Sequence, residues 1–340
     1  MSIPKWILIG SVGLFSIIGI AAVFKKKDAQ PSPADQLAQA PAETAVLSIP
    51  TPAKALSDKG GAKSRITTAS EAPIARPIIV AKGDFPNIDR IFQLFTISSS
   101  QLPIVETITY TSTVPWLKGR PAWIADYATH YNTSRHFIAR SMNGKPDYFS
   151  QKVSEGSRFN VFRNDKRIQF HLLVDVSRCK MGFYYVDLDT NERILLKTYS
   201  VGLGRLESGT LTPIGRFKLG NRVAIYKPGV NGYYQDQKVE MVQVFGTRWI
   251  PFEQEGSGSD SNATGYGLQG APWMQDPTSG QWVENREVIS AYDSDGCIRM
   301  HSEDIEELYA IVLTKPTFIE IVKDFHEAKL PGVEVAAPSR

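Results

Sequence analysis

The residues from Ile168 to Val322 limit the fold most strongly, because they read as a series of β-strands with a single clear helix. Runs rich in β-branched and aromatic residues, such as "GFYYVDL" and "ILLKTYSVG", are separated by turn residues, glycines and prolines. The helix is expected at "SEDIEELYAIV", where Ser302 can cap the first turn and apolar residues form one face. We therefore expect a mainly β domain over residues 168–323, followed by a C-terminal tail over 324–340.

The composition limits the number of domains and the class of ligand. A chain of 340 residues with 42% hydrophobic residues can bury more than one core. The formal net charge is +3 and Lys25–Lys27 is the only basic block, so the sequence does not indicate nucleic-acid binding. The two cysteines, Cys179 and Cys297, stand alone without the spacing of a zinc site, so no metal is expected.

Residues 1–27 are expected to anchor the chain in a membrane. From Trp6 to Phe24 the sequence has no charged residue, and a helix of that length spans roughly 28 Å, close to the thickness of a bilayer core. The apolar run continues directly into lysines without a small-x-small cleavage site, which favours an uncleaved anchor over a signal peptide. These lysines weakly favour a cytoplasmic location for the rest of the chain.

Two segments connect the anchor to the folded domains. Residues 28–75 are rich in Ala, Pro and Ser and lack a sustained apolar period, which is typical of an extended linker. Residues 76–107 include "FPNIDRIFQLF", whose apolar residues recur at helical spacing. We expect a short helix in this segment that packs against the next domain.

Residues 108–163 predict a small unit of strand, helix, helix and strand. The stretches "WLKGRPAWIADYATHYNTSRHFIARSMN" and "FSQKVSEGSRFNV" resemble a LysM domain, a module that binds N-acetylglucosamine-containing glycans such as peptidoglycan. The alternative is an unrelated helical hairpin that only packs on the domain that follows. His130 and His136 lie in this unit, and we expect both to be surface or packing residues.

The motif "SDGCIRM" at residues 294–300 carries the chemistry that the sequence indicates. A thiol acts as a nucleophile when its proton can leave and when backbone N–H groups face the developing oxyanion. Gly296 permits a tight turn, which would leave the amides of Gly296 and Cys297 free to donate. Arg299 could bind a substrate carboxylate or favour the thiolate.

This motif resembles the signature of the YkuD-type L,D-transpeptidase catalytic domain. "GTLTPIGRFKL" and "GYGLQGAPW" resemble further segments of that family in the correct order. The resemblance implies a mainly β cysteine enzyme that acts on bacterial peptidoglycan stem peptides through a thioester, without a metal or organic cofactor. The residues that it implies are Cys297, Ser294, Gly296 and Arg299 for catalysis, and Tyr266 and Thr212 for substrate binding.

The substrate that the resemblance implies lies outside the cytoplasmic membrane. We therefore expect the anchor at residues 6–24 to place the folded domains in the periplasm or extracytoplasmic space, against the weak bias of the lysines. The expected partners are the peptide stems and glycan strands of peptidoglycan.

Two positions depart from the family pattern. Asp295 replaces the second histidine of the Ser/Thr-His-Gly-Cys motif, and Gln269 stands where the general-base histidine belongs. An amide cannot accept a thiol proton at neutral pH. His301, Asp293 or Asp295 could act instead, although a carboxylate raises the pKa of a nearby thiol. Alternatively, backbone dipoles and Arg299 could favour the thiolate, or the domain could bind peptidoglycan without catalysis.

The loop after Gln269 holds Trp273 and Trp282. These tryptophans could stack on sugar rings or form a lid over the site, or could simply hold the loop against the domain. A disulfide between Cys179 and Cys297 is the remaining interpretation of the thiols, and we disfavour it because it would consume the nucleophile.

Overall fold

The computed structural model describes residues 83–145, 151–207, 209–254 and 264–335, all within one compact unit of residues 48–340. Within these ranges no helix is long and apolar enough to cross a membrane. The anchor expected at residues 6–24 and the linker expected at 28–75 lie outside the described residues.

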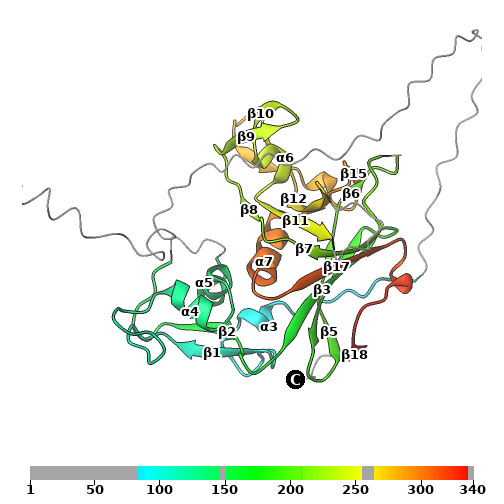
Figure 1. Cartoon of the computed structure of the whole chain (residues 1–340). Helices are drawn as coiled ribbons and strands as arrows, with labels where there is room; N and C mark the ends of the chain where they lie inside the picture. Colours follow the sequence, from blue (N-terminus) through cyan, green and yellow to red (C-terminus); the bar gives the residue numbers. More distant parts are fainter. Residues whose placement is uncertain (1–82, 146–150, 208, 255–263, 336–340) are drawn as a thin grey trace, which may run out of the picture. The chain divides into compact units, whose positions relative to one another are not determined.

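A ten-stranded mixed sheet forms the centre of the domain, as Figure 1 shows. The strand order is β16-β12-β11-β7-β17-β3-β4-β5-β18, and β8 pairs with β11 beside this path. The mainly β domain expected from residue 168 onward is confirmed. The strands are β3 (Ile168–Asp175), β4 (Lys180–Asp187), β5 (Glu192–Ser200), β7 (Gly215–Leu219), β8 (Ala224–Ile225), β11 (Arg248–Gln254), β12 (Gly267–Gly270), β16 (Ile298–Met300), β17 (Thr317–Val322) and β18 (Val333–Glu334).

Helix α7 (Ser302–Val312) covers one face of this sheet and follows directly after β16. Ile305, Leu308 and Ile311 are fully buried in the core that the helix shares with the sheet. The expected cap is wrong, because His301 occupies the N-cap position and Ser302 is the first helical residue. The Ser302 backbone N–H donates instead to the side chain of Glu284, at 2.5 Å from Oε1.

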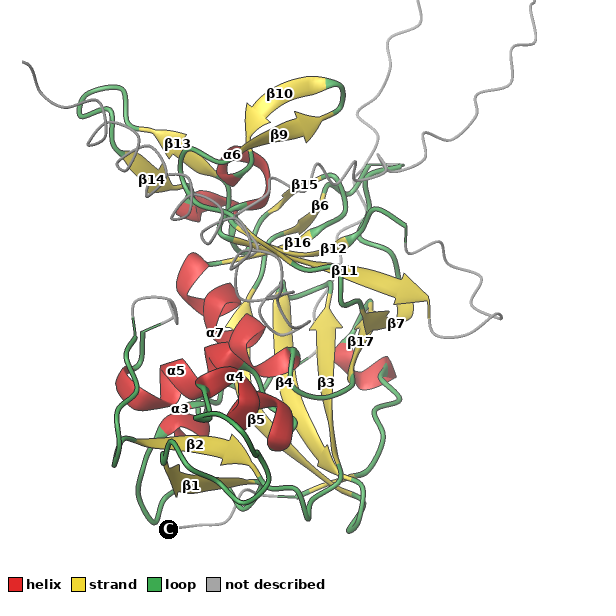
Figure 2. Cartoon of the chain, turned by 60° about the vertical axis from the view of Figure 1, so that its left-hand side comes forward, coloured by secondary structure: helices red, strands yellow, loops and turns green. Residues whose placement is uncertain are grey.

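Short elements gather at the end of the sheet where β12 and β16 lie (Figure 2). They bury an apolar cluster whose centre includes Met241, Phe245 and Trp249 and against which Cys297 packs. These elements are β6 (Leu203–Gly204), β9 (Asn231–Tyr234), β10 (Gln237–Glu240), α6 (Val242–Phe245), β13 (Trp273–Gln275), β14 (Trp282–Glu284), the 3-10 helix η1 (Arg286–Val288) and β15 (Tyr292–Ser294).

The unit at residues 105–162 has the expected order of strand, helix, helix and strand. It consists of β1 (Val105–Thr109), α4 (Ile124–His130), α5 (Arg135–Asn143) and β2 (Arg158–Phe162), with β1 and β2 antiparallel. We call it the βααβ unit. It has an apolar cluster of its own, which includes the residues Tyr110, Tyr127, Ile138 and Phe159.

The βααβ unit also contributes residues to the core of the main sheet. Phe137 and Phe162 belong to the core of the main sheet, and the ring of Phe162 lies 5.8 Å from that of Phe170 on β3. The Ser134 hydroxyl caps α5 and also donates to the carbonyl of Ala310 in α7, at 2.8 Å. The two parts of the chain therefore share one hydrophobic core.

The segments on either side of these domains also pack on the sheet. Helix α3 (Phe92–Phe95) is shorter than expected, and its Leu94 is fully buried in the main core. At the other end, η2 (Phe325–Glu327) is followed by β18, which pairs with β5. Arg193 on β5 donates to the three consecutive carbonyls of residues 330–332. Residues 324–335 are thus part of the fold rather than a free tail.

Candidate active site

The turn that carries Cys297 is closed by the side chain of Ser294. The Ser294 hydroxyl donates to the Cys297 carbonyl at 2.6 Å and accepts the backbone N–H of Gly296 at 3.1 Å. Gly296 has a φ of +107°, and a Cβ there would lie only 2.4 Å from Cε1 of Tyr266. Only glycine fits this backbone, because a side chain would be strained and would also clash with the tyrosine ring.

This hydrogen bond corrects one expectation about the oxyanion site. The backbone N–H of Gly296 was expected to be free, but it is bonded to Ser294. The backbone N–H of Cys297 has no hydrogen-bond acceptor among the described residues. It is therefore the available donor beside the thiol.

The turn rests on a second layer of backbone that contains two glycines. Gly202 exchanges two backbone hydrogen bonds of 2.8 Å with Arg299, and Gly204 donates to the hydroxyl of Thr212 at 2.8 Å. A Cβ on Gly204 would lie 2.8 Å from the Cα of Gly296. Thr212 is buried behind this layer, where its hydroxyl accepts from backbone.

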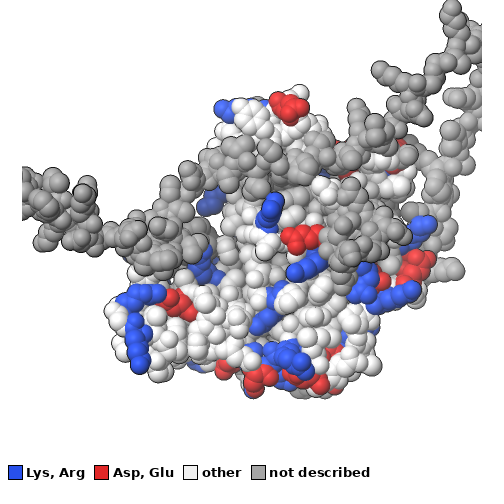
Figure 3. All heavy atoms as spheres, viewed as in Figure 1, with Lys and Arg blue, Asp and Glu red and all other residues white. Residues whose placement is uncertain are grey.

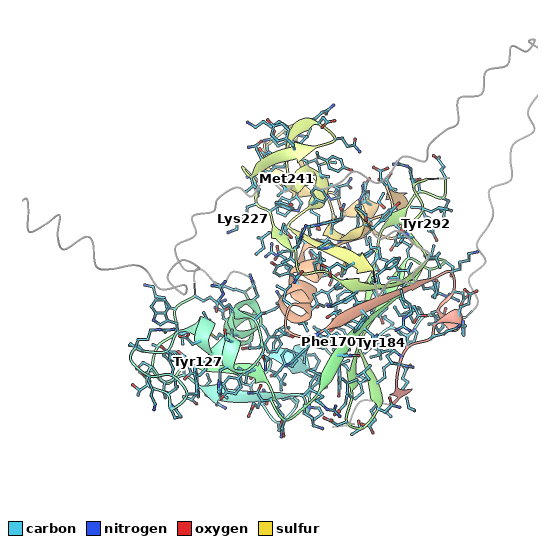
Figure 4. The ribbon with its side chains drawn as sticks, viewed as in Figure 1. Tyr127, Phe170, Tyr184, Lys227, Met241 and Tyr292 are labelled. Carbon is cyan, nitrogen blue, oxygen red and sulfur yellow. The ribbon has the colours of Figure 1, made fainter. Side chains whose placement is uncertain are left out.

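On the other flank, β15 begins at Tyr292, which Figure 4 labels. The Tyr292 hydroxyl donates to the Val176 carbonyl at 2.7 Å, so the strand that leads into the turn is tied to the end of β3. The Cys297 backbone is therefore held from both sides.

The thiol of Cys297 opens into a pocket of about 230 Å³. The side chain is partly exposed, and its sulfur donates weakly to the Gly265 carbonyl at 3.7 Å. The pocket is lined by Tyr234, Gln243, Val244, Phe245, Gly265, Gln269, Pro272, Ser294, Asp295, Cys297 and Arg299.

Burial of the Cys297 thiol raises its pKa to about 12. The backbone N–H of Gly267 and the positive charge of Arg299 act in the opposite direction, while the charge of Asp295 adds to the increase. Loss of water around the sulfur disfavours the thiolate more than these groups stabilise it. The resting site therefore holds a neutral thiol.

Two charged residues border the pocket. Arg299 Nη1 lies 3.2 Å from both the carbonyl and the carboxylate of Asp293, and its Nε is buried without a hydrogen-bond partner among the described residues. Asp295 forms an ion pair with Arg205 at the rim, and both side chains are largely exposed. Asp293 therefore holds part of the Arg299 guanidinium, while the Arg299 side chain lines the pocket.

Gln269 lines the same pocket as Cys297. It pairs with Arg299 across the parallel strands β12 and β16, and its side chain is buried. The amide Nε2 donates to the carbonyl of Val244 in α6 at 3.0 Å. No histidine is present among the described residues that line the pocket.

The other candidates from the sequence lie outside the pocket lining. His301 lies between β16 and α7, with its Nδ1 3.9 Å from Glu284 Oε2. Trp273 and Trp282 lie in the β13–β14 hairpin, and both pack on the apolar cluster below the site. Trp273 also donates to the Ser302 hydroxyl at 3.1 Å, which fastens the hairpin to α7.

Tyr266 and Cys179 both lie outside the lining of the pocket. Tyr266 covers Gly296 and packs against the main core, outside the residues that line the pocket. Cys179 is buried, and both cysteines are free thiols, so the disfavoured disulfide is absent.

One wall of the pocket consists of residues that no sequence motif indicated. Tyr234, Gln243, Val244 and Phe245 come from β9 and α6, within residues 231–245. This stretch contains no motif of catalytic residues. The pair of tyrosines before the turn "QD" was the one available signal, because alternation along a strand places one of two neighbours inward.

The charges on the face shown in Figure 3 are mixed, with Lys and Arg beside Asp and Glu. Within the described ranges, no group of three or more His, Cys, Asp or Glu side chains is placed to hold a metal ion. The chemistry that the site can support therefore centres on the Cys297 thiol and backbone or side-chain hydrogen bonds.

These features define a mainly β domain with a cysteine on a glycine turn at the floor of a pocket. Residues 169–321 match the model of the YkuD family, described as the L,D-transpeptidase catalytic domain. This segment is therefore a YkuD domain, as the sequence motifs predicted. The comparison with curated proteins finds no match.

Two solved structures resemble the chain, both of the helical cell shape determining protein Pgp2 from Campylobacter jejuni. One shares 15% identity, covers 50% of this chain and 51% of that chain, and has a TM-score of 0.32. The other is a lysine-to-alanine mutant of the same protein, with 14% identity, 51% coverage of both chains and a TM-score of 0.32. The match thus spans about half the length of those proteins.

Proposed function

We propose that this protein is a cysteine L,D-transpeptidase that acts on the peptide stems of bacterial peptidoglycan. The observation that carries the proposal is the Cys297 thiol, which opens into a pocket from a locked glycine turn within a YkuD domain. In this reaction the sulfur attacks the carbonyl of the third residue of a tetrapeptide stem. A C–S bond forms, the C–N bond breaks, and the terminal D-alanine leaves.

The residues around the thiol have separate roles in this proposal. The Cys297 backbone N–H donates to the oxyanion, since it has no acceptor among the described residues. Ser294 and Gly296 keep that N–H oriented by closing the turn. Arg299, which lines the pocket, binds a carboxylate of the stem through its guanidinium. An amine of a neighbouring stem, or water, then resolves the thioester.

The remaining parts of the chain would bring this site to its substrate. The βααβ unit would bind glycan strands in the manner of a LysM domain. The segment at residues 6–24 would anchor the protein in the cytoplasmic membrane, with the domains on the outer side of that membrane where peptidoglycan lies. Remodelling of crosslinks at that location would influence the shape of the cell.

A second candidate function is binding of peptide stems without turnover. Gln269 favours it, because this amide cannot accept the thiol proton and its N–H is already bonded to Val244. The raised pKa of Cys297 favours it also. In this case the pocket and Arg299 would hold a stem peptide while the thiol stays unreactive.

Intact-mass spectrometry of the full chain with a carbapenem separates the two functions. We expect the parent protein to gain the mass of one carbapenem and the Cys297→Ala protein to gain none. A parent that stays unmodified while Gln269→His reacts would favour stem binding without turnover. If neither protein reacts, Cys297 is not a nucleophile and the enzyme proposal is rejected.

A further inference from the structure

The proposed reaction requires a group that accepts the thiol proton and returns a proton to the leaving amine. Gln269 cannot take this proton, and no histidine is found among the described lining residues. The lining residues that can exchange a proton or carry a hydroxyl are Tyr234, Ser294, Asp295 and Arg299, besides Cys297 itself.

Three of these four groups are already engaged or unsuitable. The Ser294 hydroxyl is held by the carbonyl of Cys297 and the N–H of Gly296. Asp295 is paired with Arg205, and its charge opposes formation of the thiolate. Arg299 stays protonated at all relevant pH values and therefore cannot act as an acceptor. The phenol of Tyr234 remains, and its hydrogen-bond partner is the uncharged side chain of Gln235.

The position of Tyr234 is fixed by a tight hairpin. It is the last residue of β9, and the two residues that follow, Gln235 and Asp236, have φ values of +50° and +62°. Two positive φ values in a two-residue loop are typical of a type I′ turn, which sets the register of the two strands. The pairing of Tyr234 with Gln237 across the turn confirms that register.

Packing directs the ring of Tyr234 towards the pocket. The ring lies edge-on to that of Phe245, with centroids 5.6 Å apart, and it packs on the same apolar cluster as Cys297. At the base of the hairpin, Gly232 lies so close to Met241 that a Cβ would be 2.4 Å from its sulfur. Tyr233, the neighbour on the strand, is 59% exposed.

The charges of the site also change the pKa of the Tyr234 phenol. Burial raises the pKa of Tyr234, and the charges of Asp295 and Cys297 raise it further, while a hydrogen bond with the Gln235 side chain and the charge of Arg299 act in the opposite direction. The phenol therefore stays protonated at neutral pH and can both donate and accept a hydrogen bond.

We propose that Tyr234 relays the proton during acyl transfer at Cys297, in place of the histidine that this pocket lacks. The inference rests on the proposed function. As the C–S bond forms, the thiol proton passes to the Tyr234 hydroxyl oxygen. The original phenol proton passes to the amide nitrogen of the leaving D-alanine as the C–N bond breaks. The phenol is neutral before and after the step, and no other reactant is required.

The test compares Tyr234→Phe with Tyr233→Phe in the full chain. Positioned proton transfer typically contributes on the order of 10²- to 10⁴-fold to a rate, so Tyr234→Phe should slow carbapenem adduct formation at least 100-fold. Tyr233→Phe should stay within about twofold of the parent, because its side chain points to solvent.

Two further readouts separate a relay from a structural role. In the Cys297→Ala background, Tyr234→Phe should leave the Kd for a tetrapeptide stem unchanged. The adduct rate of the parent should show no step near pH 6.5, where an ordinary histidine titrates. A Tyr234→Phe protein that reacts at the parental rate, or loses stem affinity in proportion to its rate, would overturn the relay alone. A parent protein that never reacts would overturn the proposed function together with it.

Discussion

At the scale of single residues, the site depends on a few side chains that leave little freedom to the Cys297 turn. The Ser294 hydroxyl forms hydrogen bonds with both the Gly296 N–H and the Cys297 carbonyl, and the ring of Tyr266 fills the space beside Gly296. The motif "SDGC" predicted the glycine turn, but not that Ser294 would use the Gly296 N–H. That detail depends on the rotamer of the serine, which the sequence does not specify.

Gly296→Ala should distort this turn. The alanine must adopt a positive φ, and its Cβ must displace the ring of Tyr266. We therefore expect a loss of stability on the order of 1–3 kcal/mol and loss of carbapenem adduct formation. Gly280→Ala is the matched control, because Gly280 has a φ of +67° with nothing within 4 Å of its Cβ position. Chemical denaturation and adduct mass measure both effects. Equal stability losses in the two variants would contradict the role of Tyr266.

The pKa of Cys297 predicts how its reactivity changes with pH. A free cysteine has a pKa of about 8.5, so its alkylation levels off above that pH. Because the pKa of Cys297 is about 12, its thiolate fraction should still rise roughly tenfold per pH unit between pH 8 and pH 10. Iodoacetamide labelling followed by mass spectrometry measures this, with Cys297→Ala to assign the site. A rate that levels off below pH 8 would show that the thiol is activated at rest.

At the scale of elements, strands and helices with clear periodicity were predictable. The helix at Ser302–Val312 lies where the sequence placed it. The hairpin β9–β10 was missed, although it supplies Tyr234. Its short strands carry little hydrophobic pattern, and its place over the pocket comes from tertiary contacts with Phe245 and Met241.

The same limit applies to the βααβ unit. Its local pattern predicts the two helices, but the pattern cannot show that Phe137 faces the main core rather than the core of the unit. Only the packing of α5 on α7 shows which core receives this side chain.

Phe137→Ala should therefore destabilise the whole described domain. Phe137 is fully buried, and truncation of such a side chain costs about 3–5 kcal/mol. Since the core is shared, tryptophan fluorescence and far-UV circular dichroism should report one unfolding transition at the same lower denaturant concentration. Trp123→Ala, at a residue 51% exposed, serves as the control with a small effect. Two separate transitions would show that the βααβ unit folds independently.

At the scale of the whole molecule, a YkuD domain and a βααβ unit are joined through one core, and the first of these carries a pocket with a cysteine and a glutamine. The match of residues 169–321 to the YkuD model was predictable from ordered motifs. The protonation state of the Cys297 thiol was not predictable, because its pKa depends on burial by β9, α6 and the β12 backbone.

The central claim is that Cys297 performs acyl transfer on a peptide stem despite Gln269. The most direct measurement is release of D-alanine from a purified tetrapeptide stem by the full chain, followed over time beside the Cys297→Ala protein. We predict release by the parent and none by the alanine variant. Equal release by both, or no release by the parent while it binds the stem, would contradict the claim.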